Sequence, residues 1–266
     1  MILIADSGST KTKWGYTEDG VTLVRTIETE GINPVLQSAE VIERILGEVD
    51  FSNVDKVRFY GAGCAECANL QTLKQLLVSH AGTDDVVVQS DIVGAAIALF
   101  GNKPGIACIL GTGSNSINWD GSMIERNIHA GGFILGDEGS GSVLGKWLIS
   151  DFIKGLTPEW MTKILRDEYH LDYFTVIEHV HRQPMPNRWL AQFAKLLGAH
   201  RNDEYVHNLL VGEFRRFFER NVMRYEGYGS LPVGFIGSIA YVFEDELREA
   251  ALQYGINVAK IMKTPF

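Results

Sequence analysis

Two short loops rich in glycine and hydroxyl side chains limit what this chain can fold into. The first covers residues 6–12, Asp-Ser-Gly-Ser-Thr-Lys-Thr, between an apolar run and a second strand-like stretch. The second covers residues 111–115, Gly-Thr-Gly-Ser-Asn, in the same setting. Glycine lets backbone N–H groups approach an anion closely, and neighbouring hydroxyls add donors. One such loop in each half of the chain indicates a duplicated strand–loop–strand unit that binds a phosphate chain from both sides.

The pattern of apolar residues predicts a mixed α/β protein with an internal duplication. Strands are predicted at 2–5, 13–17, 21–28, 54–60, 86–89, within 106–128 and at 233–237, and helices at 35–49, 67–80, 92–100, 142–153 and 240–254. The sequence Gly-Asn-Lys-Pro-Gly at 101–105 is the strongest break. We therefore expect an N-terminal domain at 1–104 and a C-terminal domain at 105–266, with a helical insert at about 158–225.

Composition restricts the partners of the chain more than its chemistry. Its 266 residues carry a net charge of −9, which argues against general binding to nucleic acid or to an anionic membrane. The N-terminus shows no signal sequence, and three cysteines fit reduced thiols better than a disulfide framework, so we expect a cytoplasmic protein. The Arg- and Phe-rich stretch 213–224 is interpreted as an amphipathic helix with a solvated charged face.

Three motifs in order carry a resemblance to a known family. They are Asp-x-Gly-x-Thr-Lys-Thr at 6–12, Gly-Thr-Gly-Ser-Asn at 111–115 and Gly-Asp-Glu-Gly-Ser-Gly at 136–141. The chain resembles the actin-like ATPase superfamily of sugar kinases, and within it the N-acetylglucosamine kinases and the related BadF/BadG/BcrA/BcrD ATPase family. The resemblance implies two ribonuclease-H-like domains that flank a cleft, with the nucleotide deep inside and the sugar nearer the mouth. It also implies a homodimer.

The resemblance implies roles in nucleotide binding for residues in three places. Asp6 is similar to the aspartate that holds Mg²⁺, usually through water, and such coordination suits Mg²⁺. Binding of phosphate and nucleotide falls to Ser7, Gly8, Ser9, Thr10, Lys11, Gly111, Thr112, Gly113, Gly234, Gly237 and Ser238. A plain structural reading stays open, in which Asp6 caps a turn and the loop glycines only supply positive φ angles. The segment around Gly237 is equally compatible with a simple strand-to-helix turn.

Asp91 is the candidate catalytic base. It follows a predicted strand and opens the predicted helix 92–100. Family kinases place their catalytic aspartate at this junction, where a carboxylate accepts the proton of a sugar hydroxyl during phosphoryl transfer. Aspartate is also a favoured residue for capping a helix N-terminus, which is the alternative.

The resemblance places the sugar at five further residues. Carboxylates accept hydrogen bonds from sugar hydroxyls, and amides can do so through their oxygen. The candidates are Asn33, Ser114, Asn115, Asp137 and Glu138. A turn at the Asn-Pro sequence is the alternative for Asn33, and capping of the helix that begins near 142 by Asp137 or Ser140 is the alternative for the acidic turn.

The primary hypothesis is an enzyme that uses ATP and Mg²⁺ to phosphorylate an amino sugar, with N-acetylglucosamine and its 6-phosphate preferred. One alternative is an activator ATPase of the 2-hydroxyacyl-CoA dehydratase kind, for which Cys64 and Cys67 would hold an iron–sulfur cluster. Another is a sugar sensor without catalysis. Family chains continue past the last strand with a short apolar helix that packs on the first domain, whereas this sequence stops at 263–266. We expect that difference to weaken coupling between the domains.

Overall fold

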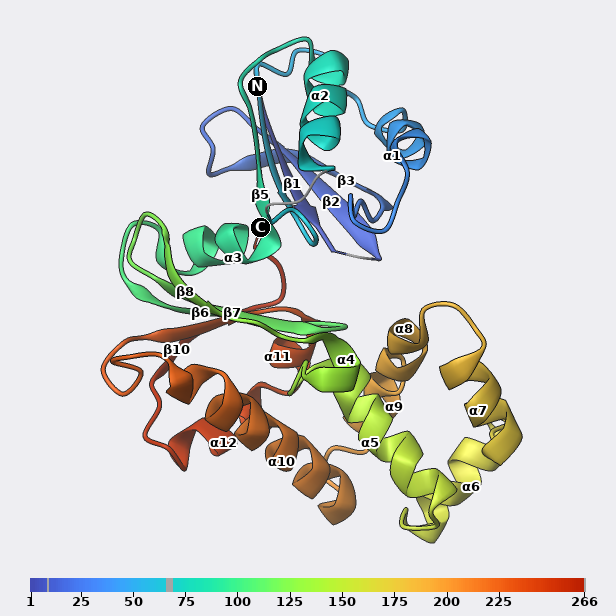
Figure 1. The fold of residues 1–266 in the computed structure, drawn as a ribbon. Coiled ribbons are helices and arrows are strands. Elements are labelled where there is room, and N and C mark those ends of the chain that lie inside the picture. The colour runs from blue at the N-terminus through green and yellow to red at the C-terminus, as the bar shows by residue number, and fades with distance from the viewer. Residues whose placement is uncertain (9, 66–68, 266) are drawn as a thin grey trace. The chain divides into compact units, whose positions relative to one another are not determined.

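The protein consists of two compact units in a computed structural model that describes residues 1–8, 10–65 and 69–265. Residues 1–98 and Pro265 form one unit, and residues 99–264 form the other (Figure 1). The division falls inside helix α3 (Asp91–Phe100), whereas the sequence predicted a boundary after residue 104.

Packing of the end of α3 explains where the units divide. Leu99 and Phe100 contact the strand residue Gly234 so closely that a Cβ atom there would lie 3.0 Å and 2.9 Å from their side chains. Phe100 also covers Gly105. The last residues of the helix therefore pack with the sheet of the second unit.

The first unit is built on a five-stranded mixed sheet in the order β3-β2-β1-β4-β5. Its strands are β1 (Ile2–Ser7), β2 (Lys11–Thr17), β3 (Leu23–Glu30), β4 (Lys56–Gly61) and β5 (Val86–Ser90). β1 and β2 form an antiparallel hairpin, and β1, β4 and β5 are parallel. Helices α1 (Ala39–Leu46) and α2 (Leu70–Ala81) share one hydrophobic core with the sheet.

Alternation along β1 separates two neighbouring candidate residues. Leu3, Ala5 and Ser7 are fully buried, whereas Asp6 is only partly buried. Because successive side chains of a strand point to opposite faces of the sheet, Asp6 and Ser7 project in opposite directions. The same hairpin therefore presents its aspartate on one face and its serine hydroxyl on the other.

The second unit repeats this sheet in the order β10-β9-β6-β7-β8. Its strands are β6 (Gly105–Leu110), β7 (Ser114–Trp119), β8 (Ile124–Ile128), β9 (Val233–Ile236) and β10 (Val258–Met262). Reading β6 to β10 as counterparts of β1 to β5 gives the same neighbours and the same directions. The predicted internal duplication is confirmed.

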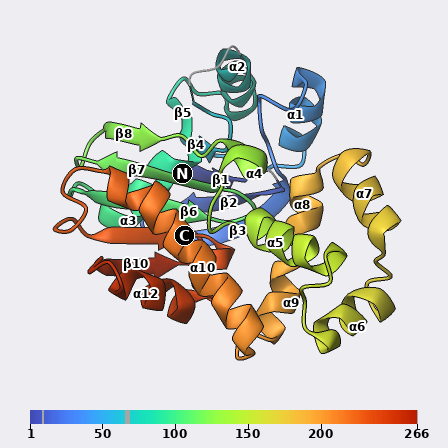
Figure 2. The same cartoon turned by 60° about the horizontal axis from the view of Figure 1, so that its bottom comes forward.

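Helices fill most of the remaining second unit. They are α4 (Gly132–Leu135), α5 (Gly141–Ile153), α6 (Glu159–Asp167), α7 (Tyr173–His181), α8 (Pro186–Ala191), α9 (Ala194–Ala199), α10 (Glu204–Arg220), the 3₁₀ turn η1 (Val222–Arg224), α11 (Ser238–Val242) and α12 (Glu244–Leu252). α5 packs on α8, and α10 lies beside α12 (Figures 1 and 2). None of the helices in the described residues is long and apolar enough to cross a membrane.

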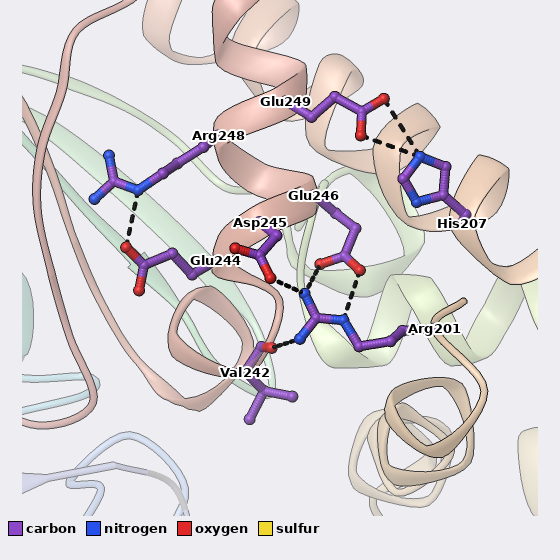
Figure 3. Close-up of polar contacts among 8 residues, drawn as sticks. All are labelled: Arg201, His207, Val242, Glu244, Asp245, Glu246, Arg248 and Glu249. Atoms are coloured by element: carbon purple, nitrogen blue, oxygen red, sulfur yellow. Dashed lines mark hydrogen bonds and ion pairs between the residues drawn. The ribbon is translucent and has the colours of Figure 1, made fainter. Parts of the chain in front are cut away.

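A single arginine fixes the break between α11 and α12, which the sequence predicted as one helix. Arg201 donates to both carboxylate oxygens of Glu246 at 2.8 Å, and to Asp245 at 2.7 Å (Figure 3). It also donates to the carbonyl oxygen of Val242 at 3.1 Å, the last residue of α11. Glu246 is buried, and this two-pronged pairing provides the partner that a buried carboxylate needs. α11, which follows β9 directly, is thereby held at its far end.

Candidate active site

The first glycine-rich loop is a tight turn between β1 and β2. Gly8 N–H donates to the Lys11 carbonyl at 3.0 Å, and Gly8, Thr10 and Lys11 are all exposed. The Lys11 ammonium forms an exposed ion pair with Glu28 at 2.8 Å. The predicted contact from Ser9 lies outside the described residues. The described part of the loop thus presents backbone and one ammonium group to solvent.

The loop glycines do not have positive φ angles, so the alternative in which they serve only to supply such angles is wrong. None of Gly8, Gly111 and Gly113 has a left-handed backbone conformation. A Cβ atom would meet nothing within 4 Å at Gly111, and at Gly8 only the Lys11 carbonyl at 3.7 Å, which is ordinary contact. Glycine at these two positions is required neither by the backbone conformation nor by packing. Its remaining physical effect is to leave space for another molecule beside the backbone.

The Ser7 hydroxyl is bonded within the protein, and the predicted role of Ser7 in phosphate binding stays a prediction. Its Oγ lies 2.6 Å from the Thr12 hydroxyl and donates to the Ile32 carbonyl at 2.9 Å, and it accepts from the Ile32 N–H at 3.0 Å. The side chain is fully buried because it points to the core face of β1. Its hydroxyl instead ties the end of the loop to the residue that precedes Asn33.

Asn33 forms the turn that was its alternative explanation. Its Oδ1 accepts from the Val35 N–H at 3.0 Å, and Gln37 accepts from the Asn33 N–H at 2.8 Å. This turn delays the start of α1 relative to the predicted helix 35–49. Gly63 lies close against the Asn33 amide, since a Cβ atom at position 63 would be 2.3 Å from Asn33 Oδ1. Asn33 is therefore held rigidly, and a role for its amide in sugar binding stays a prediction.

Two carboxylates lie near each other at the carboxyl edge of the first sheet. Asp6 is the penultimate residue of β1, and Asp91 follows β5 directly. Burial, and then the charge of Asp91, raise the pKa of Asp6 to about 6, whereas Lys13 and Lys11 lower it. Burial also raises the pKa of Asp91, against hydrogen bonds from Ser90 and Ile92. Parallel strands that end at one edge bring together residues far apart in the sequence.

Helix capping does not account for Asp91. It is itself the first residue of α3, and its Oδ1 accepts from the adjacent Ile92 N–H at 2.9 Å and from the Ser90 hydroxyl at 3.1 Å. A capping side chain reaches the N–H two or three positions further on. The Oδ2 atom has no hydrogen-bond partner among the described residues. The carboxylate is thus positioned by its neighbours with one oxygen open, as a proton acceptor requires.

The face that carries Asp6 is hollow. A cavity of about 490 Å³ lies within the first unit and is lined by residues that include Ile4, Asp6, Tyr60 and Ile97. The Tyr60 ring lies against α3 at Gly94, because glycine has no Cβ atom, which would otherwise come within 2.7 Å of the ring. Asp6 therefore faces open space rather than packed side chains.

The second glycine-rich loop is held by the start of α5. Gly141 and Ser142 donate their N–H groups to the carbonyls of Gly111 and Thr112 at 2.9 and 3.1 Å. Gly237, with φ +128°, lies against the same loop, because a Cβ there would lie only 2.1 Å from the Leu110 carbonyl. The loop, the glycine-rich turn at 136–141 and the start of α11 therefore meet in one place within the second unit.

The predicted nucleoside residues differ in what their surroundings allow. Gly234 is buried in β9 against Leu99 and Phe100, so packing is the reason for glycine there. Ser238 is exposed at the start of α11. Contact with a nucleoside thus stays a prediction for Gly237 and Ser238, and for Gly234 the structure offers a purely internal role.

Asp137 lies directly against the second loop. Its Oδ1 accepts from the Ser114 N–H at 3.3 Å, and its backbone has the strained φ of +55°. Burial raises the pKa of Asp137 to about 6, helped by the charge of Glu138 and opposed by the Ser114 N–H and by Lys146. Ser140, not Asp137, caps α5, by accepting from the Val143 N–H at 3.3 Å. Helix capping therefore accounts for Ser140 but not for Asp137.

The side chains of Glu138 and Asn115 are already partly engaged. Glu138 accepts from Arg220 Nε at 2.5 Å and from Asn221 Nδ2 at 3.3 Å. Asn115 Oδ1 accepts from the Ser116 N–H at 2.9 Å and from Asn127 Nδ2 at 3.0 Å. Both residues are fixed by neighbours, and neither has a carboxylate or amide oxygen that is wholly free.

A polar hollow of about 420 Å³ adjoins Glu138. Its lining includes His129, Gly136, Arg220, Asn221 and Arg224. The stretch 213–224 was predicted as an amphipathic helix with a solvated charged face, and Glu213 departs from that prediction because it is a charged residue on the buried side, as is the polar Asn221. The signal that could have found them is their spacing: residues 213, 214, 217 and 221 share one helical face with the phenylalanines of the core.

No protein-family model and no curated protein matches the chain. Solved structures do. A putative N-acetylglucosamine kinase from Porphyromonas gingivalis is 40% identical over 100% of this chain and 95% of that chain, with a TM-score of 0.95. A putative N-acetylglucosamine kinase from Chromobacterium violaceum is 20% identical over 96% and 93%, with a TM-score of 0.73. A ROK family glucokinase from Streptomyces griseus, solved with glucose and AMPPNP, is 16% identical over 97% and 93%, with a TM-score of 0.57.

These likenesses, with two sheets of one topology and a glycine loop after the first strand of each, define the actin-like ATPase fold of the sugar kinases. The identity to the Porphyromonas gingivalis protein extends over the full length. The chain belongs to the family of that protein, a family of sugar kinases.

Proposed function

We propose that this protein transfers the γ-phosphate of ATP to an amino sugar, with N-acetylglucosamine as the acceptor and the 6-phosphate as the product. The observation that carries the proposal is the pair Asp6 and Asp91 at one edge of the first sheet, each with a raised pKa and neither explained by folding alone. The sequence motifs of this protein also support a place in the BadF/BadG/BcrA/BcrD ATPase family.

Asp91 is the proton acceptor in this proposal. A sugar hydroxyl donates its proton to the open Oδ2 while its oxygen bonds to the γ-phosphorus, and the bond to the β-γ bridging oxygen breaks. Ser90 and Ile92 hold the other carboxylate oxygen, which fixes the direction of the open one. Alignment of this kind supplies much of the rate of phosphoryl transfer.

Asp6 fits the role of a magnesium-binding residue. It is a partly buried carboxylate that faces a cavity and lies beside an exposed glycine loop. Carboxylate and water oxygens are the ligands that Mg²⁺ prefers, and the bound ion neutralises charge on the phosphates. We assign phosphate binding to the backbone of Gly8 and Thr10 and to that of Gly111, Thr112 and Gly113.

Asp137 is the strongest candidate for sugar binding. It combines a strained backbone with a buried carboxylate that packs against Gly113, where a Cβ atom would lie 3.0 Å from its Oδ2. Two hydroxyls of a sugar can donate to one carboxylate, which gives both affinity and orientation. Glu138, Asn115, Ser114 and Asn33 complete the proposed sugar-binding set.

The test is a coupled assay of ADP release with ATP, Mg²⁺ and a panel of sugars. We expect turnover with N-acetylglucosamine that exceeds turnover with glucose, glucosamine and N-acetylmannosamine, and ³¹P and ¹³C spectra of a product phosphorylated at carbon 6. ATP hydrolysis that is independent of every sugar would contradict the proposal, and a 1-phosphate would contradict its regiochemistry.

The two alternatives lead to different results in the same preparation. For an activator ATPase, Cys64 would have to bind a cluster, yet its thiol is buried, and Cys67 lies outside the described residues. Protein purified without oxygen that contains stoichiometric iron and sulfide would favour that alternative. A sugar sensor would bind N-acetylglucosamine in calorimetry without releasing ADP.

A further inference from the structure

Tyr225 follows the 3₁₀ turn η1, and its hydroxyl bonds two neighbouring strands of the second sheet. The residue is 1% exposed and belongs to the core of the second unit. Its hydroxyl donates to the Ser116 carbonyl at 2.7 Å, lies 2.8 Å from the Ser116 hydroxyl, and accepts from the Ile128 N–H at 3.0 Å. Ser116 of β7 and Ile128 of β8 are opposite each other in the register. Because a phenol has one hydrogen and can accept two hydrogen bonds, these three contacts use its full capacity.

The two residues bonded by this hydroxyl lie close in the chain to the groups that hold Asp137. The Asp137 N–H donates to the Ala130 carbonyl at 2.9 Å, and Ala130 is two residues after Ile128. The Asp137 carboxylate accepts from the Ser114 N–H at 3.3 Å, and Ser114 is two residues before Ser116. Both of these hydrogen bonds therefore come from a short segment whose other end is bonded to the same hydroxyl.

Asn127 extends this connection to a further residue of the proposed sugar-binding set. Its Nδ2 donates to the Ser116 carbonyl at 2.7 Å and to Asn115 Oδ1 at 3.0 Å. The Ser116 carbonyl thus accepts from both Tyr225 and Asn127. The position of the Asn115 amide therefore depends on the same end of β7 that Tyr225 holds.

Stability of the core alone does not explain a hydroxyl at position 225. Phenylalanine would fill the same space among the apolar side chains, and burial of a hydroxyl costs free energy that its hydrogen bonds largely offset. Burial also raises the pKa of Tyr225 to about 12, so the phenol keeps its hydrogen at neutral pH. The specific effect of the hydroxyl is to fix the end of β8 against the start of β7.

We propose that Tyr225 is a positioning residue for sugar binding, whose hydroxyl holds β7 and β8 together and thereby fixes the place of Asp137. The inference rests on the proposed function for its kinetic consequence, whereas the order of residues 128–137 does not depend on any activity. Asp137 has a φ of +55°, a conformation that aspartate keeps only when its surroundings impose it. A shift of Ala130 or Ser114 therefore displaces its carboxylate.

The structural part is tested by hydrogen exchange of residues 128–137 in the wild type and in Tyr225→Phe. Phenylalanine keeps the ring in the core and removes all three contacts of the hydroxyl. We expect the amides of this segment to exchange about tenfold faster or more, whereas those of α12 should change less than about twofold. Ser116→Ala removes only the contact between the two hydroxyls, so its effect should be smaller, and it decides the case if Tyr225→Phe does not fold.

The kinetic part uses the same variants. We expect the KM for N-acetylglucosamine to rise about tenfold in Tyr225→Phe and about threefold in Ser116→Ala. The KM for ATP should change less than about twofold in both variants, because the residues that Tyr225 helps to hold belong to the proposed sugar-binding set.

Tyr205→Phe is the matched control, since it removes a hydroxyl hydrogen bond from another place in the second unit. Tyr205 lies at the start of α10 and donates to Asp151 Oδ2 of α5 at 2.9 Å. Its loss should lower the free energy of unfolding. Both KM values of Tyr205→Phe should nevertheless equal those of the wild type, which separates a general loss of stability from a loss of position.

Two results would overturn the positioning role. One is wild-type exchange of residues 128–137 in Tyr225→Phe. The other is a KM for N-acetylglucosamine that stays at the wild-type value in Tyr225→Phe, or that rises equally in Tyr205→Phe, either of which would make Tyr225 a structural residue only. A wild type that phosphorylates no sugar would instead contradict the proposed function, and the exchange measurement would still decide the structural part.

Discussion

The two sheets share one topology but present different chemistry after equivalent strands. In the first unit, β1 ends with Asp6 and Ser7 and β5 is followed by Asp91, so two carboxylates gather at one edge. In the second unit, β6 ends with Ile109 and Leu110, and the carboxylate of Asp137, which accepts from the Ser114 N–H, comes from the 136–141 turn. Duplication thus explains two glycine loops, whereas the proposed proton transfer and metal binding belong to one copy. In the other copy the carboxylates lie on the 136–141 turn, which contacts helix α10.

The largest effect should come from removing Asp91, the proposed proton acceptor in the first unit. Asp91→Asn keeps size and shape but cannot accept the sugar proton, so kcat should fall about 1,000-fold. Nucleotide affinity measured by calorimetry should stay within about twofold, because the phosphate loops are untouched. Asp84→Asn, an exposed carboxylate just before β5, is the control and should keep full activity. Equal loss in both variants would contradict a specific role of Asp91 as the proton acceptor.

A glycine that packs against the second loop should matter for folding. Gly237→Ala places a Cβ atom 2.1 Å from the Leu110 carbonyl in a backbone conformation unsuited to alanine. We expect the free energy of unfolding of the second unit to fall by about 3 kcal/mol. Urea unfolding followed by tryptophan fluorescence measures this change. Gly132→Ala provides a comparison, since its φ of +70° is unfavourable but open space surrounds it, so its loss should be smaller.

The loop glycines themselves should affect binding rather than folding. Gly8→Ala and Gly111→Ala meet no close atom in the protein, so unfolding free energies should change by less than about 1 kcal/mol. If phosphates approach both loops, each variant should raise the Kd for ATP about tenfold. An effect at Gly8 alone would mean that the second loop is a copy of the first in shape but not in function.

The smallest effect concerns pH, and both units should show it. Asp6 and Asp137 have pKa values raised to about 6 in the folded protein from 3.8. A raised pKa favours the folded state at low pH, and this advantage is lost as the pH rises through 6. Between pH 5 and 7.5 the wild type should therefore lose about 1 kcal/mol relative to Asp6→Asn or Asp137→Asn. Parallel pH curves for wild type and variants would show that neither carboxylate titrates as described.

Much of this arrangement could be predicted from local sequence, and the failures share one cause. Strands, the duplication and the two loops follow from apolar patterning and glycine position, which are local properties. The break between α11 and α12 and the burial of Glu213 depend on partners far away in the chain. Arg201, for example, lies 41 and 45 residues before its partners Val242 and Glu246. A motif specifies residues, whereas the face of the strand decides where a hydroxyl points, so the motif alone did not predict that the Ser7 side chain is buried.

The buried hydroxyl of Ser7 has a consequence for how ligands influence each other. It bonds Thr12 at the end of the phosphate loop and both backbone groups of Ile32, the neighbour of Asn33. Whatever ordering one ligand imposes on this hydrogen-bonded joint is already present when the second ligand arrives. If the proposed nucleotide and sugar sites both order this joint, the two ligands raise each other's affinity, and by thermodynamic reciprocity they do so by the same factor. Ser7→Ala would uncouple the two binding events while leaving each ligand all of its direct contacts.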